Sequence, residues 1–495
     1  MFKKILIANR GEIGVRVVRT CREMGIESVA IYEAADSGSL HVRLADECVL
    51  LDSPQGFADE AAVLAAAKAK GVDAIHPGYG FLAETPSFVR ACAAAGITTI
   101  SPPAEFIATV RNKVDALETA RAAGFPTVVY SKRSFGPDEF DELQAEAEEM
   151  GYPLVVKSCR GGRGRGSRLV RRRENLAQTA RRARVEAQTH YGYERLYLEK
   201  AIMSAHQIGV QILGDNQGNL VHLGEREGSL IYSNQKVIEE APAPSLTPQQ
   251  RAQIQQTALE LARLFGLQNA GTVEFLVDSS GQQYFAEIKP RLQREHMLTE
   301  MLTGIDLVRE QIQLAAGRPL SFSQADITWK GAAMACRISA EDPWNNFLPS
   351  PGAVRRVRLP NGPGIRVDTY VYGGCEIPAA YDPLIAKLAV WGEDRPQCLA
   401  RMRRALEDFI LIGPPTNIPY VQRILYAPEF ISGDYNTEFL AHPFRDEPPP
   451  VEHFRDLAVA AALLYLRRAH AFTPSQPERL RSNWHRDSRR LPGQG

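Results

Sequence analysis

The first hundred residues alternate between short apolar segments and amphipathic helical segments, and this alternation limits the possible folds more than any other feature. The predicted strands cover residues 4–8, 28–32, 74–76 and 98–100, and the predicted helices cover 13–24, 60–70 and 87–95. Strands separated by helices pair in parallel, because each return connection crosses over the sheet. The sequence therefore predicts a doubly wound α/β sheet at its start.

Length and composition exclude several classes of protein. A chain of 495 residues suggests two to four domains. Lys+Arg and Asp+Glu number 58 each, so no net charge favours nucleic acid or an anionic membrane as a partner. No apolar run has the length of a membrane span, and we expect the first residues to form a strand rather than a signal peptide. The seven cysteines form no Cys-x-x-Cys pair, which argues against a zinc site and a disulfide framework and favours a cytoplasmic protein.

A predicted hairpin carries two carboxylates. The strand with Glu274 turns at 279–281, and a second strand, 283–288, returns with Glu287. Residues that mirror each other about such a turn point from the same face. Two carboxylates on one face suit Mg²⁺ (or Mn²⁺) and nucleotide phosphates.

The segment after this hairpin carries Arg291, Gln293 and Glu295 at alternating positions. In an extended chain these three side chains share one side. A guanidinium, an amide and a carboxylate next to a metal-phosphate site favour binding and deprotonation of a small oxyanion. The alternative is an ordinary hairpin with surface charges, in which Glu295 caps the helix predicted over 296–304.

Two glycine-rich loops are candidate ligand contacts. Strand 154–157 runs into a loop whose backbone amides could surround phosphates, although it lacks the Gly-Lys-Ser/Thr of a Walker A loop. Its glycines are Gly161, Gly162, Gly164 and Gly166. The loop 76–82 follows a strand at its carboxyl end, a usual position for ligand contact. Residues 9–14 lack the glycine order of a dinucleotide fingerprint, and the basic helix predicted over 171–186 lacks the aromatics of a nucleic-acid platform.

The chain resembles biotin carboxylases over roughly residues 1–445. The matching motifs occur in order: Ile-Ala-Asn-Arg-Gly-Glu-Ile at 7–13, His-Pro-Gly-Tyr-Gly-Phe-Leu at 76–82, Gln-Lys-Val-Ile-Glu-Glu-Ala-Pro-Ala-Pro at 235–244, Cys-Arg-Ile-Ser-Ala-Glu-Asp at 336–342 and Phe-Leu-Pro-Ser-Pro-Gly at 347–352. The resemblance implies mixed α/β and α+β architecture with an ATP-grasp fold. It implies a Rossmann-like pre-ATP-grasp domain over 1–112, an ATP-grasp domain over 113–315 with a lid over about 130–203, and a C-terminal biotin carboxylase domain over 330–443. A linker, a helix and a basic tail are expected over 444–495.

By the same resemblance, the cofactors and substrates are ATP, Mg²⁺ and bicarbonate, with biotin on a separate carrier protein. Glu274 and Glu287 would hold the metal. The residues implied around the nucleotide are Lys113, Lys157, Glu199, Lys200, Ile202 and Leu276, with the four loop glycines. The residues implied for bicarbonate and biotin are Lys236, Arg291, Gln293, the base Glu295, Arg337, Tyr79 and Gly80.

Departures from the family pattern concentrate near the nucleotide and the metal. The family motif Glu-Met-Asn-x-Arg-x-Gln-Val-Glu-His becomes Glu-Ile-Lys-Pro-Arg-Leu-Gln-Arg-Glu-His, with Lys289 for asparagine and Arg294 for valine. The other substituted positions are Arg160, Arg163, Ser167, Gln207, Gly209, Ile231 and Asn234. An ammonium at Lys289 would weaken Mg²⁺ binding or substitute for one cation, whereas the bicarbonate and biotin residues are retained.

Three functions follow from this pattern. The first is the biotin carboxylase component of a carboxylase with several subunits, which acts on an acyl-CoA of acetyl-CoA type. This component would be a homodimer acting with a biotin carboxyl carrier protein and carboxyltransferase subunits. The second function is a catalytically weakened homologue that serves in binding or regulation. The third is an ATP-grasp ligase with another acceptor, which the retained Tyr79 and Arg337 disfavour.

Overall fold

A five-stranded parallel sheet begins the chain, as the βα alternation predicts. Its strand order is β3-β2-β1-β4-β5, with β1 Lys4–Ile7, β2 Glu27–Tyr32, β3 Glu47–Leu50, β4 Ala74–His76 and β5 Thr98–Thr99. The helices that follow these strands are α1 Gly11–Glu23, α2 Leu40–Leu44, α3 Glu60–Lys70, α4 Pro86–Ala94 and α5 Ala104–Arg111. The prediction missed β3, an edge strand of four residues that alternate between partly buried and exposed.

The computed structural model describes residues 1–159, 168–232, 235–441 and 454–471. Two units separate by their internal contacts, residues 1–443 and 444–495. The second unit contains α15 Phe454–Ala471, close to the helix predicted over 454–469. Within the described ranges, no helix combines the length and apolar character that a membrane crossing requires.

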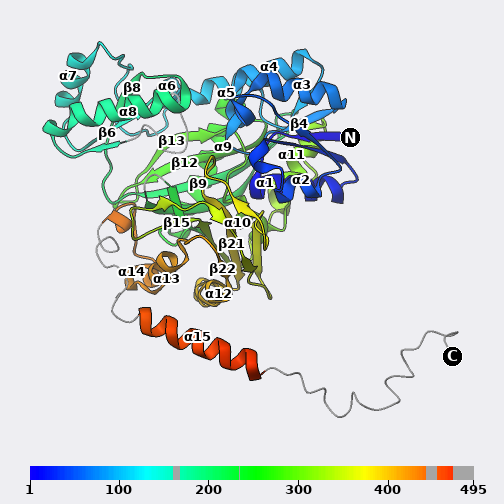
Figure 1. Ribbon diagram of the computed structural model, residues 1–495. Coiled ribbons are helices and arrows are strands. Elements are labelled where there is room, and N and C mark those ends of the chain that lie inside the picture. Colours follow the sequence, from blue (N-terminus) through cyan, green and yellow to red (C-terminus); the bar gives the residue numbers. More distant parts are fainter. Residues whose placement is uncertain (160–167, 233–234, 442–453, 472–495) are drawn as a thin grey trace. The chain divides into compact units, whose positions relative to one another are not determined.

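An eight-stranded antiparallel sheet forms the centre of the first unit (Figure 1). Its strand order is β13-β12-β9-β10-β11-β14-β21-β19. The bounds are β9 His206–Gly214, β10 Leu220–Tyr232, β11 Gln235–Ala241, β12 Asn269–Val277, β13 Gln283–Lys289, β14 Ala332–Ser339, β19 Ile365–Thr369 and β21 Leu384–Gly392. Because β11 pairs with β14, the sheet joins stretches that the sequence assigns to different domains.

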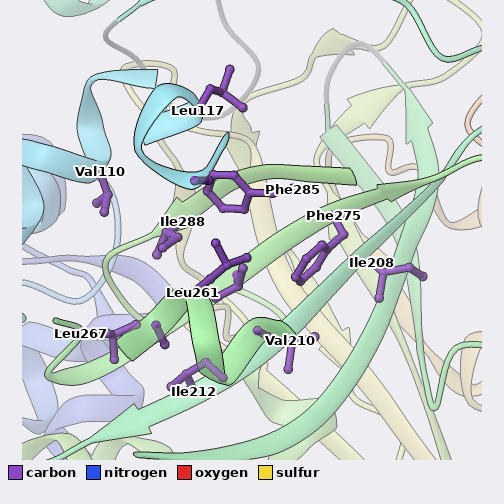
Figure 2. Close-up of a cluster of buried hydrophobic side chains, with 14 of the residues drawn as sticks. Val110, Leu117, Ile208, Val210, Ile212, Leu261, Leu267, Phe275, Phe285 and Ile288 are labelled. Carbon is purple, nitrogen blue, oxygen red and sulfur yellow. The ribbon is translucent and has the colours of Figure 1, made fainter. Parts of the chain in front are cut away.

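Helices α6 Lys113–Ala122 and α9 Pro248–Phe265 contribute to the apolar core beside β9, β12 and β13 (Figure 2). Helix α9 begins at a capping box formed by Thr247 and Gln250 and ends at the left-handed Gly266. Its buried positions Ile254, Ala258 and Leu261 recur with helical spacing and form one apolar face. This core holds the two strands that carry Glu274 and Glu287.

A separate three-stranded sheet, β7-β6-β8, corresponds to the predicted lid region. It comprises β6 Leu154–Ser158, β7 Arg168–Val170 and β8 Leu196–Lys200, with α7 Phe140–Met150 and α8 Leu176–Tyr191 in the same hydrophobic cluster. The basic helix predicted over 171–186 was misplaced: Arg173–Asn175 form a 3-10 turn, and α8 continues to the left-handed Gly192. Buried Leu176, Ala180 and Ala183 set its packing face, rather than the arginines. The loop glycines Gly161, Gly162, Gly164 and Gly166 lie outside the described residues.

Five more helices belong to the first unit. Helices α10 His296–Thr303 and α11 Leu307–Ala315 precede the α+β region predicted over 330–440, and α12 Arg395–Asp408, α13 Ile418–Tyr426 and α14 Pro428–Ser432 lie within it. Three short antiparallel pairs join β15 Glu341–Asp342 to β16 Leu348–Pro349, β17 Gly352–Ala353 to β20 Glu376–Ile377, and β18 Arg356–Arg358 to β22 Ile410–Ile412.

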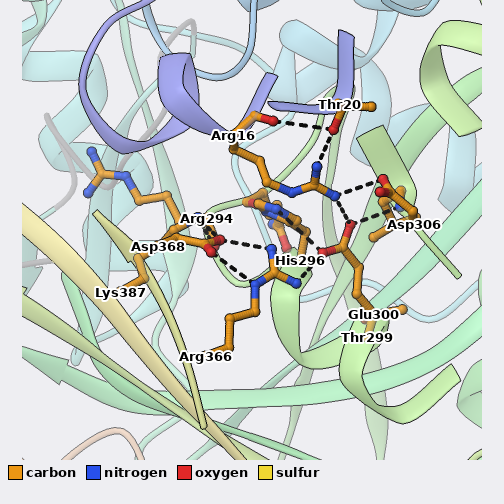
Figure 3. Close-up of polar contacts among 12 residues, drawn as sticks. Arg16, Thr20, Arg294, His296, Thr299, Glu300, Asp306, Arg366, Asp368 and Lys387 are labelled. Carbon is orange, nitrogen blue, oxygen red and sulfur yellow. Dashed lines mark hydrogen bonds and ion pairs between the residues drawn. The ribbon is translucent and has the colours of Figure 1, made fainter. Parts of the chain in front are cut away.

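A network of ion pairs fixes α10 against its neighbours (Figure 3). Arg16 of α1 lies 3.1 Å from Glu300 of α10 and 2.7 Å from Asp306. Arg366 of β19 lies 2.5 Å from Glu300 and 2.9 Å from Asp368. Because α10 directly follows Glu295, this network also determines where the predicted base lies.

Candidate active site

A cavity of about 760 Å³ collects the predicted site residues. Every predicted residue that the structure describes lines it: Tyr79, Gly80, Lys113, Lys157, Glu199, Lys200, Ile202, Lys236, Glu274, Leu276, Glu287, Arg291, Gln293, Glu295 and Arg337. They come from segments more than two hundred residues apart, so the fold brings together what the sequence shows only in linear order.

The two predicted metal carboxylates lie directly opposite each other. Glu274 of β12 and Glu287 of β13 are register partners in the antiparallel pair, as the mirror positions about the turn predict. Glu274 accepts hydrogen bonds from Gln293 Nε2 (2.8 Å) and Gln207 Nε2 (3.2 Å). The Glu287 carboxylate lies 3.5 Å from Lys113 Nζ. Both carboxylates therefore face the cavity.

These two carboxylates fit a divalent cation whose remaining ligands come from a nucleotide. Carboxylate oxygens are the hard ligands that Mg²⁺ prefers, and Mg²⁺ is usually bound through one or two carboxylates plus phosphates and water. No cluster of three or more His, Cys, Asp or Glu side chains with metal-binding potential occurs in the described part of the chain. A cation between Glu274 and Glu287 would thus need phosphate oxygens as further ligands.

Lys289 occupies the same hairpin face and pairs with one of these carboxylates. Its Nζ lies 2.7 Å from Glu287 Oε1. Burial favours the neutral amine, but the carboxylates of Glu287, Glu274 and Glu84 outweigh this effect and raise the pKa of Lys289. Of the two predicted metal carboxylates, Glu287 is the one with which Lys289 forms this direct ion pair.

A second group of charges surrounds Glu295 and is linked to Glu274 through Lys236. Lys236 Nζ lies 2.9 Å from Glu295, 3.3 Å from Glu239 and 3.4 Å from Glu274. Arg337 Nη2 lies 3.1 Å from Glu239 and 3.3 Å from Glu295. Lys236 and Arg337 thus bridge the buried carboxylates of Glu239 and Glu295, and Lys236 also contacts Glu274, a predicted metal ligand.

The charges around Glu295 keep it ionised. Burial raises the pKa of this carboxyl, but Lys236, Arg337 and Arg226 outweigh burial and hold its pKa well below the usual range. Burial and the neighbouring Glu295 raise the pKa of Glu239. Two adjacent carboxyls with pKa values displaced in opposite directions are typical of an acid–base site. Glu295 occupies the N-cap position of α10 without a side-chain capping bond, so the structure contradicts the helix-cap alternative.

The predicted site residues are held in place by others that the sequence did not indicate as site residues. Arg226 donates to Gln293 Oε1 (2.8 Å), and Gln293 in turn donates to Glu274. Arg291 pairs with Glu84 at 2.5 Å. Arg226 could have been found from the sequence, because a charged residue in the middle of the buried strand β10 is unusual. Glu239 could also have been found, because it lies within the 235–244 motif. Glu84, in a short 3-10 turn, offered no such signal.

Strands β6 and β8 contribute predicted nucleotide contacts to the cavity wall. Lys157 of β6 hydrogen-bonds to Glu199 of β8, and Tyr197 Oη donates to the other oxygen of Glu199 at 2.5 Å. Lys200 Nζ donates to the backbone carbonyls of Gly151 (3.0 Å) and Tyr152 (3.3 Å). This lysine therefore joins the end of β8 to the backbone that precedes β6.

Several substituted positions lie around this cavity. Ile231 lines its wall. Gly209 is the register partner of Glu274, and a Cβ at this position would lie 3.1 Å from Thr272 Cγ2 but 3.9 Å from Glu274 Cγ, so the missing side chain leaves room for Thr272. Arg160, Arg163, Ser167 and Asn234 fall outside the described residues.

Arg294 lies in the wall between this cavity and a neighbouring cavity of about 430 Å³. Its guanidinium pairs with Asp382 (2.7 Å) and lies 5.6 Å from the centroid of the Tyr79 ring. Tyr79 faces both cavities, and its buried hydroxyl has no hydrogen-bond partner among the described residues. Alternation in an extended segment would turn Arg294 away, but residues 294 and 295 form a turn, so adjacent side chains reach the same cavity.

Three family models match successive parts of the chain. The model for the biotin carboxylase N-terminal domain matches residues 1–107. The model for the ATP-binding domain of the carbamoyl-phosphate synthase L chain matches residues 112–323. The model for the biotin carboxylase C-terminal domain matches residues 335–442.

Curated proteins resemble the chain over most of its length. Biotin carboxylase 1 of Bacillus subtilis (strain 168) is 43% identical over 444 residues, covering 89% of this chain and 98% of the relative. The biotin carboxylase of Nostoc sp. (strain PCC 7120) is 44% identical over 443 residues, covering 89% and 98%.

Solved structures show the same similarity. The biotin carboxylase domain dimer of Hydrogenobacter thermophilus 2-oxoglutarate carboxylase, in complex with MgADP, ADP and bicarbonate, gives a TM-score of 0.86 at 42% identity, covering 89% of this chain and 97% of that chain. A Campylobacter jejuni biotin carboxylase in complex with β,γ-ATP gives 0.85 at 38% identity, covering 90% and 99%.

Proposed function

The chain belongs to the biotin carboxylase family and has its ATP-grasp fold, and from this premise we propose that it carboxylates carrier-bound biotin within a larger carboxylase of several subunits that acts on an acyl-CoA. The observation that carries the proposal is the position of Glu295, ionised between Lys236 and Arg337, in the cavity that Glu274 and Glu287 also line. In this proposal, Glu295 and Lys236 act on bicarbonate, Arg337 acts on biotin, and Glu274 and Glu287 hold the metal that accompanies ATP.

In the proposed first step, Glu295 accepts the proton of bicarbonate. The bicarbonate oxygen then forms a bond to the γ-phosphorus of ATP, the bond to the β-phosphate oxygen breaks, and ADP and carboxyphosphate result. Lys236 and Arg291 bind the anion, and Gln293 adds an amide contact. An ionised Glu295 is ready for this proton transfer because its pKa lies well below the usual range.

The nucleotide end of the cavity is proposed to position ATP for this attack. Lys113 and Lys157 contact the phosphates, together with backbone amides of Gly161, Gly162, Gly164 and Gly166. Glu199, Lys200, Ile202 and Leu276 border the base. Mg²⁺ (or Mn²⁺) held by Glu274 and Glu287 would offset charge on the phosphates when bound.

In the proposed second step, carboxyphosphate breaks into CO₂ and phosphate, N1′ of biotin gives its proton to this phosphate, and N1′ then attacks the CO₂. Arg337 stabilises the negative charge on the ureido oxygen, and Tyr79 and Gly80 border the ring. Arg337 already pairs with Glu295 at 3.3 Å, so the base and the enolate-stabilising cation lie in one cluster.

The assembly is proposed to be a cytoplasmic homodimer that acts with a separate biotin carboxyl carrier protein and carboxyltransferase subunits. An acetyl-CoA-type acceptor and a role in fatty acid synthesis belong to the same proposal.

The Lys289–Glu287 pair favours a second candidate, a weakened homologue that binds its partners without turning over ATP, since an ammonium occupies part of the metal site. Bicarbonate-dependent phosphate release from MgATP, with and without free biotin, distinguishes the two. The first function predicts release that biotin stimulates, and the second predicts none. Stimulation only by an acceptor other than biotin would favour the ligase alternative.

A further inference from the structure

Lys289 places a fixed positive charge on the face that carries the two metal carboxylates. It lies two residues after Glu287 on β13, and residues at this spacing point to the same side of a strand. Its register partner is Thr272, two residues before Glu274 on β12. Glu274, Glu287 and Lys289 therefore form one patch of the hairpin, and all three line the cavity.

The Lys289 side chain is nearly buried, with 9% of its surface exposed. Its ammonium lies 2.7 Å from Glu287 Oε1, while Lys113 lies 3.5 Å from the other oxygen, Oε2. Glu287 thus has a cation at each oxygen. An ammonium offers three donors and no lone pair, so it neutralises a carboxylate but cannot coordinate a metal ion.

The remaining carboxylate, Glu274, is engaged differently. Its contacts are two amides, Gln207 and Gln293, and the more distant Lys236 at 3.4 Å. Amide donors shift to a new partner without leaving a charge uncompensated. One metal ion can therefore bind Glu274 together with Glu287 Oε2, from which Lys113 is 3.5 Å away, whereas a second ion at Glu287 Oε1 would have to displace Lys289 at 2.7 Å.

Phosphoryl-transfer sites that use two metals hold them about 3.5–4 Å apart between shared ligands. On the hairpin face, the Lys289 ammonium occupies the place next to Glu287 where a second ion would share that carboxylate. We infer that Lys289 is a resident cation that takes the place of one divalent ion, so that this site binds its nucleotide with a single Mg²⁺. The inference rests on the proposed nucleotide site and specifies its metal requirement.

Charge on the transferring phosphoryl group is then offset by one divalent ion together with Lys289 and Lys113. Nucleotide binding then depends on the charge of Lys289 and not on the concentration of a second metal ion in solution. Occupancy of the site should saturate with one metal per nucleotide.

The test counts Mn²⁺ ions per bound ADP, by electron paramagnetic resonance and equilibrium dialysis at saturating ADP. We compare the full-length wild-type protein with Lys289→Arg, which keeps the charge, and Lys289→Asn, which replaces it with a ligand oxygen. The inference predicts one Mn²⁺ per ADP in the wild type and Lys289→Arg, and two in Lys289→Asn. Bound ADP in each sample shows that the variant is folded.

Two Mn²⁺ per ADP in the wild type would overturn the inference, as would one in Lys289→Asn, while leaving the proposed nucleotide site intact. Absence of ADP binding by the wild type would contradict the proposed function itself, and the inference with it. The two failures are therefore distinguishable in one experiment.

Discussion

Lys236 Nζ lies 2.9 Å from Glu295 Oε1, although 59 residues of sequence separate them. Lys236 belongs to β11, and Glu295 directly precedes α10, which packs on β11 and β14 and is pinned by Arg16 and Arg366. The pair thus depends on how a helix is anchored to a sheet. Its chemical consequence is a buried carboxylate that stays ionised at neutral pH.

Glu295→Gln should remove the proton acceptor while retaining the size of the side chain. General-base catalysis contributes about 10²–10⁴-fold, so we expect kcat for bicarbonate-dependent ATP cleavage to fall by a factor in this range. ADP binding should remain, because Glu295 contacts none of the proposed nucleotide residues except through Lys236. Glu260→Gln, on the exposed face of α9, is the matched control and should retain full activity. Equal losses in both variants would contradict a role specific to Glu295.

Arg226→Lys should weaken the site through Gln293. The guanidinium donates to Gln293, Gln211 (3.1 Å) and Thr299 (2.6 Å), a set that one ammonium cannot reproduce. Buried acceptors left unsatisfied cost about 1–3 kcal/mol, so urea denaturation should show a lower free energy of unfolding by this amount. Because Gln293 would lose its orientation, KM for bicarbonate should rise more than KM for ATP. An unchanged ratio of the two KM values would contradict the positioning role.

His76 should make the protein less stable in acid. Burial lowers its pKa from the ordinary 6.5 to about 3, and Nδ1 accepts a hydrogen bond from the Gly78 amide. The unfolded chain therefore takes up a proton below pH 6.5 that the folded chain refuses, and stability falls as the pH falls. Between pH 6.5 and 5 this amounts to about 2 kcal/mol, at 1.36 kcal/mol per pKa unit.

His76→Asn provides the comparison, because its amide oxygen preserves an acceptor for Gly78 without titrating. We expect urea denaturation to show a loss between pH 6.5 and 5 that is smaller by about 2 kcal/mol in the variant. Identical losses in both proteins would show that His76 does not contribute to acid sensitivity.

Oxygen transfer tests the proposed route through carboxyphosphate. If bicarbonate attacks the γ-phosphate, ¹⁸O-labelled bicarbonate should transfer one label to the phosphate released. Hydrolysis by water would leave the phosphate unlabelled, and mass spectrometry of the phosphate separates the two. Unlabelled phosphate would contradict the assignment of Glu295 as the base that activates bicarbonate.

The sequence predicts local features well and distant pairings poorly. The register of Glu274 with Glu287 follows from one short turn, so the hairpin alone specifies it. The contact of Arg337 with Glu239 requires β14 to pair with β11 across 98 residues, which no local pattern encodes. The motifs indicated Lys236 and Arg337 through resemblance, but their convergence on the carboxylates of Glu239 and Glu295 became visible only in the folded chain.

Helix placement shows a similar limit. The arginines after 170 suggested a helix over 171–186, yet the buried small residues of α8 place it at Leu176–Tyr191. Exposed arginines are compatible with several placements of the helix along the sequence, whereas the alanines that must be buried are compatible with only one. The proposed domain boundaries stay predictions, because the central sheet continues from β11 to β14 across the stretch where two domains were expected to meet.

Carboxylation of biotin tests the central claim most directly. The protein is incubated with MgATP, ¹⁴C-bicarbonate and a biotinylated carrier protein, and acid-labile label on the carrier is counted. We predict ATP-dependent labelling by the wild type and a loss of about 10²–10⁴-fold in Glu295→Gln. Absence of label on the carrier with the wild-type protein, despite bound ADP, would contradict the proposed biotin carboxylase activity.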